Sequence, residues 1–236
     1  MESNQGNGPS DQRGTLCPLL AIPMSRDNFY EETTMTTDGT DLKLAETNHD
    51  IHELLRRRWS PRAFADREIS GSTMSSLLEA ARWAPSCFNE QPWSFVLAHR
   101  GDVVAFDRLL TCLAGVNQVW ARRAATLMIT VAKLAFDRNE KPNRHAFHDV
   151  GLAMENFSIQ ATAMGIAVHQ MGGFDVARSK DVLGIPDGHE PVTAVAVGYP
   201  GDPETLDKKT RTSELAVRIR RPIAEFAFAG GWGRLL

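Results

Sequence analysis

The chain has 236 residues, of which 42% are hydrophobic and 23% charged, a composition typical of a globular protein with one large or two small domains. Its formal net charge of −3 at pH 7 argues against a protein that binds nucleic acid or a membrane surface. Three widely spaced cysteines, Cys17, Cys87 and Cys112, predict neither a disulfide framework nor a zinc site and indicate a cytoplasmic protein.

Residues 1–46 are rich in Ser, Thr, Asn, Asp, Gly and Gln and show no sustained periodicity. We expect them to form a disordered or loosely attached N-terminal arm, and residues 47–236 to form one domain. The apolar run at residues 16–24 is short, contains Pro18 and Pro23, and follows no basic leader. The run therefore predicts neither a membrane span nor a signal peptide.

A basic segment, residues 56–62, follows a predicted short helix. One interpretation is a solvated helix end, where cations favour the C-terminal dipole. However, Pro61 forces Ser60 into extended geometry, and residues two apart in an extended chain share a face. Arg58, Ser60 and Arg62 should then offer two cations and a hydroxyl to one anion. The arginine fork suits a phosphate in particular.

Residues 84–95 connect a predicted helix, residues 72–83, to a predicted buried strand, residues 93–97. Pro85 ends the helix because a proline disfavours helical geometry in the residue before it, and Pro92 should hold its predecessor extended. The polar side chains between the two prolines are Ser86, Asn89 and Gln91. An amide carries both a donor and an acceptor, so it can pair with the edge of a flat ring. The alternative is ordinary turn chemistry.

The rest of the chain alternates predicted helices and strands. Helices are expected at residues 102–113, 117–124 and 145–165, strands at 126–132, 166–171 and 191–199, and a polar loop at 137–144. The helix at residues 145–165 is apolar around nearly its whole circumference, so we expect it to be buried on all sides, partly at a subunit interface. His145 and His148 lack a third ligand at a suitable spacing, so no metal site is predicted.

Paired glycines and a second basic segment occur late in the chain. Gly172 and Gly173 let the backbone approach a flat ligand closely, or else form a tight turn between a strand and a helix. Arg218 and Arg220 again stand two residues apart. The apolar tail, residues 223–236, should pack on this subunit or on another.

Five stretches together resemble the FMN-dependent nitroreductase family of flavin oxidoreductases. They are residues 58–64 (RWSPRAF), 84–93 (APSCFNEQPW), 172–174 (GGF), 198–200 (GYP) and 218–222 (RIRRP). The likeness spans roughly residues 50–226 in the family's order. It implies an α+β fold, a sandwich with a mostly antiparallel central sheet flanked by helices. It also implies a homodimer with two FMN sites, each built by both chains.

The same resemblance implies roles for individual residues. The FMN phosphate is held by a set of cations and a hydroxyl, namely Arg58, Ser60, Arg218 and Arg220. Arg62 lies near N1 and O2 of the flavin and the Gly172 N–H points at N5, so these two are the catalytic candidates. The other cofactor-binding candidates are Trp59, Pro85, Ser86, Cys87, Asn89, Gln91 and Gly173. Two positions depart from the family pattern, since Phe88 replaces a small or polar residue and Gly172 stands where many members carry an acidic one.

The implied activity is transfer of hydride from NAD(P)H, through FMN, to an electron-poor acceptor such as a nitroaromatic or a quinone, by a ping-pong mechanism. Flavin-dependent dehydrogenation or dehalogenation on the same fold, and non-catalytic FMN binding or storage, are the alternatives. The sequence contains neither GxGxxG nor a P-loop, which argues against a tightly held nicotinamide domain or an ATP site. A nucleic-acid binder using residues 56–58 is disfavoured by the net charge of −3 and by the lack of a recognised motif.

Overall fold

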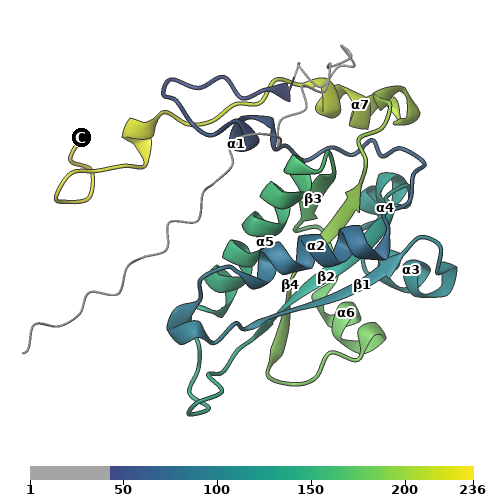
Figure 1. Ribbon diagram of the computed structural model, residues 1–236, viewed down its shortest axis with the longest axis horizontal. Coiled ribbons are helices and arrows are strands. Elements are labelled where there is room, and N and C mark those ends of the chain that lie inside the picture. The colour runs from purple at the N-terminus through teal and green to yellow at the C-terminus, as the bar shows by residue number, and fades with distance from the viewer. Residues whose placement is uncertain (1–42) are drawn as a thin grey trace, which may run out of the picture. The chain divides into compact units, whose positions relative to one another are not determined.

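The computed structural model describes residues 43–236 (Figure 1). The predicted arm therefore lies outside the described residues except for residues 43–46. The helices are α1 (Glu53–Arg57), α2 (Gly71–Arg82), α3 (Val103–Leu110), α4 (Gly115–Ala121), α5 (Ala146–Ala163), α6 (Val176–Leu183) and α7 (Lys208–Leu215). The strands are β1 (Trp93–His99), β2 (Thr126–Lys133), β3 (Ala167–Met171) and β4 (His189–Gly198).

Within this part of the chain the strands form one sheet in the order β1-β2-β4-β3, and all three pairings are antiparallel. The register between β2 and β4 shifts at Thr130 and Val131. The Thr130 hydroxyl oxygen accepts a hydrogen bond from the Thr193 N–H at 3.1 Å, which satisfies a backbone donor at the irregularity. The expected α+β class with a mostly antiparallel central sheet is confirmed.

Alternation along the strands sorts their side chains onto two faces of the sheet. On β2, Leu127 and Ile129 pack in a cluster with the buried side chains of α3 and α4. Met128 packs in a second cluster with those of α2 and α5. Helices therefore cover both faces, and the core consists of two layers of apolar side chains.

Helix α2 shows how local sequence sets the limits of an element. Its N-cap is Ser70, whose hydroxyl accepts a hydrogen bond from the Thr73 N–H at 3.1 Å, the usual satisfaction of a free N-terminal donor. Met74, Leu77 and Ala81 recur at helical spacing and are buried against α5 and the sheet. The predicted helix at residues 72–83 is therefore confirmed to within a residue.

Two predictions of burial are wrong for the single chain. Strand β1 is not a buried strand, because it lies at the edge of the sheet; Ser94 is exposed and Ala98 is its one fully buried residue. Helix α5 is not buried on all sides by its own chain, because Phe147 is 48% exposed and Gly151 and Glu155 are also exposed, and the covering of this side by a second subunit stays a prediction. Its apolar residues are concentrated on the side that packs against α2 and the sheet.

The region after β4 also differs from expectation. The polar stretch between β4 and the second basic segment predicts a loop, but it contains α7, whose N-cap Asp207 accepts hydrogen bonds from the N–H groups of Lys209 and Thr210. The apolar tail extends away from the sheet (Figure 1). Its Trp232 is 94% exposed, so this side chain is not covered within the single chain, and its burial by another subunit stays a prediction.

Candidate functional site

An open pocket of about 320 Å³ brings the two basic segments together. Its walls come from the chain after α1, from the end of α7 and from the segment that follows α7. The lining residues are Lys43, Arg58, Trp59, Ser60, Arg62, Ser213, Glu214, Ala216, Val217, Arg218, Ile219 and Arg220. Five of these side chains are cationic and one is a carboxylate, so the pocket, which we call the basic pocket, attracts an anion.

The first wall is held in place by two contacts. The Arg58 guanidinium donates to the Ser60 hydroxyl at 3.3 Å. The His169 ring nitrogen Nδ1 lies 2.8 Å from the carbonyl oxygen of Pro61. Burial, with the nearby Arg62 and Arg58 cations adding to it, lowers the pKa of His169 to about 4, although the backbone hydrogen bonds oppose this. The ring is therefore neutral at pH 7, and Nδ1–H donates to Pro61.

Glu214, which the sequence analysis did not select, anchors the same wall. Its side chain is 1% exposed and accepts hydrogen bonds from the N–H groups of Arg62, at 2.9 Å, and Ala63, at 3.1 Å. A guanidinium nitrogen of Arg62 lies 3.9 Å from the same carboxylate. An Asp207 N-cap ahead of a polar run could have indicated α7. No local signal indicates that Glu214 contacts a segment 152 residues earlier.

The second wall is formed by the segment that contains Arg218 and Arg220. The Arg218 guanidinium donates to the carbonyl oxygens of Lys43, at 2.7 Å, and Arg56, at 2.9 Å. Burial, together with the Arg58 and Arg220 cations, lowers the pKa of Arg218. Arg220 is exposed. The arginines of the two segments therefore lie close enough to repel one another, which favours an anion between them.

The predicted ring-binding residues Pro85, Ser86, Cys87, Asn89 and Gln91 lie elsewhere. They belong to the turn between α2 and β1, which in Figure 1 lies at the end of the domain opposite α1 and α7. None of them lines the basic pocket. A single chain therefore brings together six of the predicted residues (Arg58, Trp59, Ser60, Arg62, Arg218 and Arg220) and leaves this turn apart.

The turn itself has an unusual backbone. Phe88, Asn89 and Gln91 have φ values of 54°, 58° and 50°, a left-handed region that costs a non-glycine residue about 1–2 kcal/mol. The prediction that Gln91 is extended is therefore wrong. The Gln91 N–H donates to the Ser86 hydroxyl at 3.0 Å, and this tight turn overrides the preference set by Pro92. Asn89 and Gln91 are both exposed at its surface.

Contacts from two other elements hold the turn. The Cys87 N–H donates to the buried carboxylate of Asp149 on α5 at 3.0 Å. Glu90 accepts a hydrogen bond from the Asp137 N–H at 2.7 Å. The Arg138 guanidinium lies 3.6 Å from the centre of the Phe88 ring. The predicted polar loop at residues 137–144 therefore borders the turn.

The paired glycines follow β3 at the other edge of the sheet. The Gly173 carbonyl accepts hydrogen bonds from the Ala114 N–H at 2.9 Å and the Asn117 side chain at 3.0 Å. A Cβ at Gly173 would lie 2.7 Å from the Asn117 amide nitrogen, whereas one at Gly172 would meet nothing within 4 Å. A side chain at Gly173 would therefore displace the Asn117 amide from its contact with the Gly173 carbonyl, and the single chain leaves space for a ligand or a side chain at Gly172.

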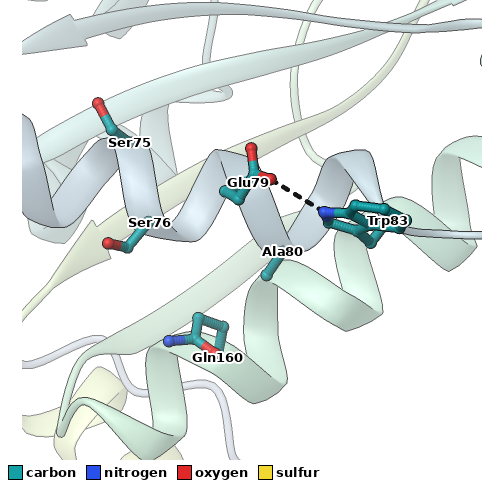
Figure 2. A pocket seen from close by; sticks show the side chains of 6 residues that line it. All are labelled: Ser75, Ser76, Glu79, Ala80, Trp83 and Gln160. Carbon is teal, nitrogen blue, oxygen red and sulfur yellow. Dashed lines mark hydrogen bonds between the residues drawn. The ribbon is translucent and has the colours of Figure 1, made fainter. Parts of the chain in front are cut away.

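A larger pocket of about 540 Å³ lies between α2 and α5 (Figure 2). The residues that line it are Ser75, Ser76, Glu79, Ala80, Trp83 and Gln160. The indole N–H of Trp83 donates a hydrogen bond to the Glu79 carboxylate at 2.9 Å, drawn as a dashed line in Figure 2. Among these described residues Glu79 is the sole ionisable group. The pocket therefore offers no cation to an anionic ligand.

Within residues 43–236, no group of three or more His, Cys, Asp and Glu residues is placed to hold a metal ion. In the same part of the chain, no helix combines the length and the apolar character needed to cross a membrane.

Comparisons with known proteins identify the family. Residues 55–119 and 113–199 match the model of the Nitroreductase family. A solved structure described as an oxidoreductase containing FMN is 32% identical, with a TM-score of 0.75 over 80% of this chain and 96% of that chain. An FMN reductase (NADPH) of Bacillus subtilis is 27% identical over 187 residues, 72% of each protein. A putative NADH dehydrogenase/NAD(P)H nitroreductase of Archaeoglobus fulgidus is 27% identical over 154 residues, 64% of this chain and 85% of its own. The chain has the nitroreductase fold and belongs to the nitroreductase family.

Proposed function

We propose that this protein is an FMN-dependent oxidoreductase that uses NAD(P)H to reduce an electron-poor acceptor, a nitroaromatic or a quinone. The observation that carries the proposal is the basic pocket. It combines four arginines, a lysine and a serine hydroxyl around one space, the donor set that suits a dianionic phosphate. Two relatives whose names include FMN and NADPH support the same cofactors.

The chain's own residues would bind the cofactor as follows. Arg58, Ser60, Arg218 and Arg220 hold the phosphate through charge-assisted hydrogen bonds. Arg62, whose side chain is 33% exposed, presents its guanidinium toward the flavin. A cation placed there stabilises the negative charge that develops during reduction.

The turn at residues 85–91 would supply the ring contacts. Pro85, Ser86 and Cys87 line the ring system, and the amides of Asn89 and Gln91 pair with its polar edge. Gly172 and Gly173 bring backbone N–H groups close to the ring. When bound, FMN supplies the hydride chemistry at N5, and the protein contributes position and electrostatics.

We also propose that the working unit is a homodimer. The turn at residues 85–91, between α2 and β1, lies at the end of the domain opposite α1 and α7 (Figure 1) and does not line the basic pocket, so two chains would complete each site. Trp83, Phe88, Phe147, Ile219 and Trp232 are large apolar side chains exposed in the single chain, and a second copy would cover such a surface. Light scattering should find a dimer at micromolar concentration. A stable monomer that retains bound flavin would contradict the proposal.

One experiment tests the activity directly. The purified protein is loaded with FMN under anaerobic conditions and mixed with NADH or NADPH while the flavin absorbance is followed. We expect the flavin absorbance to decrease. A nitroaromatic or a quinone that is added next should restore it. Because donor and acceptor use the same flavin face in turn, double-reciprocal plots should be parallel. Bound flavin that neither nucleotide reduces would instead indicate a storage protein, and intersecting plots would exclude the ping-pong mechanism.

A further inference from the structure

We propose that Lys43 is a further phosphate ligand of the basic pocket. Lys43 precedes α1 and lies outside the residues that match the family model, which begin at residue 55. The inference rests on the proposed function, because it takes the ligand to be the phosphate of FMN.

The position of the side chain is the first observation. Lys43 lines the basic pocket yet is only 5% exposed. Its ammonium donates to the carbonyl oxygen of Ala216 at 2.5 Å and lies 5.1 Å from the centre of the Trp59 ring. Both of these residues also line the pocket. Of the three N–H donors of an ammonium, one is directed to Ala216 within the described part of the chain.

The backbone of this stretch is attached to the rest of the pocket. The Arg218 guanidinium donates to the Lys43 carbonyl oxygen at 2.7 Å. The Ala45 N–H donates to the carbonyl oxygen of Arg56 at 3.0 Å. The backbone at Lys43 is therefore held by Arg218, which is 175 residues away in the chain, and through Ala45 by Arg56, and it is a fixed part of the wall.

The charge around Lys43 is the second observation. A buried ammonium is costly unless it is paired with a negative charge. The one carboxylate in the pocket, Glu214, already accepts hydrogen bonds from the Arg62 and Ala63 N–H groups. Burial is the main cause that lowers the pKa of Lys43; Arg218 and Arg62 lower it further, whereas Glu214 raises it. Among the described residues that line the pocket, Glu214 is therefore the one anion available to five cations, Lys43 included.

A phosphate would supply the missing charge. It brings two negative charges at neutral pH and several acceptor oxygens. A compact ammonium on a flexible stem binds phosphate as a point charge, beside arginines that bind it through their planar forks. Lys43 therefore adds affinity for the phosphate and contributes nothing to the flavin ring.

The test compares FMN with riboflavin, which has the same ring but no phosphate. Flavin is removed from the full-length protein, and the affinity for each compound is measured by calorimetric titration. Lys43→Met removes the charge and keeps the aliphatic stem. The matched control is Lys208→Met, which removes an exposed cation from α7, the helix that carries Glu214. If Lys43→Met does not fold, Lys43→Gln keeps a donor for Ala216 while still removing the charge.

We expect Lys43→Met to weaken FMN binding by about 10- to 100-fold, the range for losing a hydrogen bond to a charged group, and to leave riboflavin binding unchanged. Lys208→Met should leave both affinities unchanged, since an exposed charge is screened by solvent and salt. An unchanged preference for FMN over riboflavin in the Lys43 variant, or equal losses for both compounds, would overturn the inference alone. A wild-type protein that binds FMN no better than riboflavin would overturn the phosphate assignment in the proposed function as well.

Discussion

Acidification should destabilise the fold through His169, the residue that holds the Arg62 segment in place. His169 is 9% exposed, and its ring is hydrogen-bonded to the Pro61 carbonyl oxygen. Burial lowers its pKa from 6.5 to about 4 in the folded protein. Above pH 6.5 the ring is neutral in both the folded and the unfolded chain, so its contribution to stability is fully present. Between pH 6.5 and about pH 4 the His169 ring is protonated in the unfolded chain but stays neutral in the folded chain.

The magnitude follows from the difference between the two pKa values. One unit of pKa corresponds to 1.36 kcal/mol, so the free energy of unfolding should fall by about 3 kcal/mol in total between pH 6.5 and pH 4. About 2 kcal/mol of this loss falls between pH 7 and pH 5. Protonation also places a positive charge beside Arg62, while Nδ1–H can still donate to the Pro61 carbonyl.

Urea unfolding at pH 7, 6 and 5, at one protein concentration, measures the effect. Other groups also titrate, so the control is His169→Asn, whose amide N–H can donate to the Pro61 carbonyl but does not ionise. We expect the wild-type protein to lose about 2 kcal/mol more than this variant between pH 7 and pH 5. Equal losses in the two proteins would refute the reasoning, because they would show that the pKa of His169 does not differ between the folded and the unfolded chain.

Four substitutions test the site further. Glu214→Gln should lower the free energy of unfolding by about 3 kcal/mol in a urea titration, because it leaves buried donors and Arg62 without their carboxylate; a change near zero would contradict its anchoring role. Arg220→Ala should weaken FMN binding by about 1.5–3 kcal/mol. Arg221 does not line the pocket, so Arg221→Ala is the control and should have little effect. Equal effects of the two substitutions would exclude Arg220 as a phosphate ligand. Arg62→Ala should slow flavin reduction in stopped-flow measurements, and an unchanged rate would remove its proposed electrostatic role. Glu90→Gln should reduce the rate only mildly, since Glu90 holds Asp137 and the loop; a loss beyond about a hundredfold would instead indicate acid–base catalysis.

Local patterns in the sequence determined most of the elements and the chemistry of the ligand. Helical spacing and a flanking proline located α2, and a run of β-branched and apolar residues located β2. These signals are local, because a helix or strand is set largely by residues within a few positions of each other. The arginine pairs likewise indicated an anion before any tertiary contact was known. Together with three other stretches they indicated the nitroreductase family, which the family match confirms.

Only the tertiary structure decided which residues share the pocket. Arg62 and Glu214 meet across 152 residues, and the Lys43 carbonyl is bound by a guanidinium 175 residues away. The folded structure also separated the turn at residues 85–91 from the basic pocket and gave Gln91 a left-handed backbone. The physical reason is the same in each case. These features depend on contacts between residues that are far apart in the sequence, and neither local propensity nor residue spacing encodes such contacts.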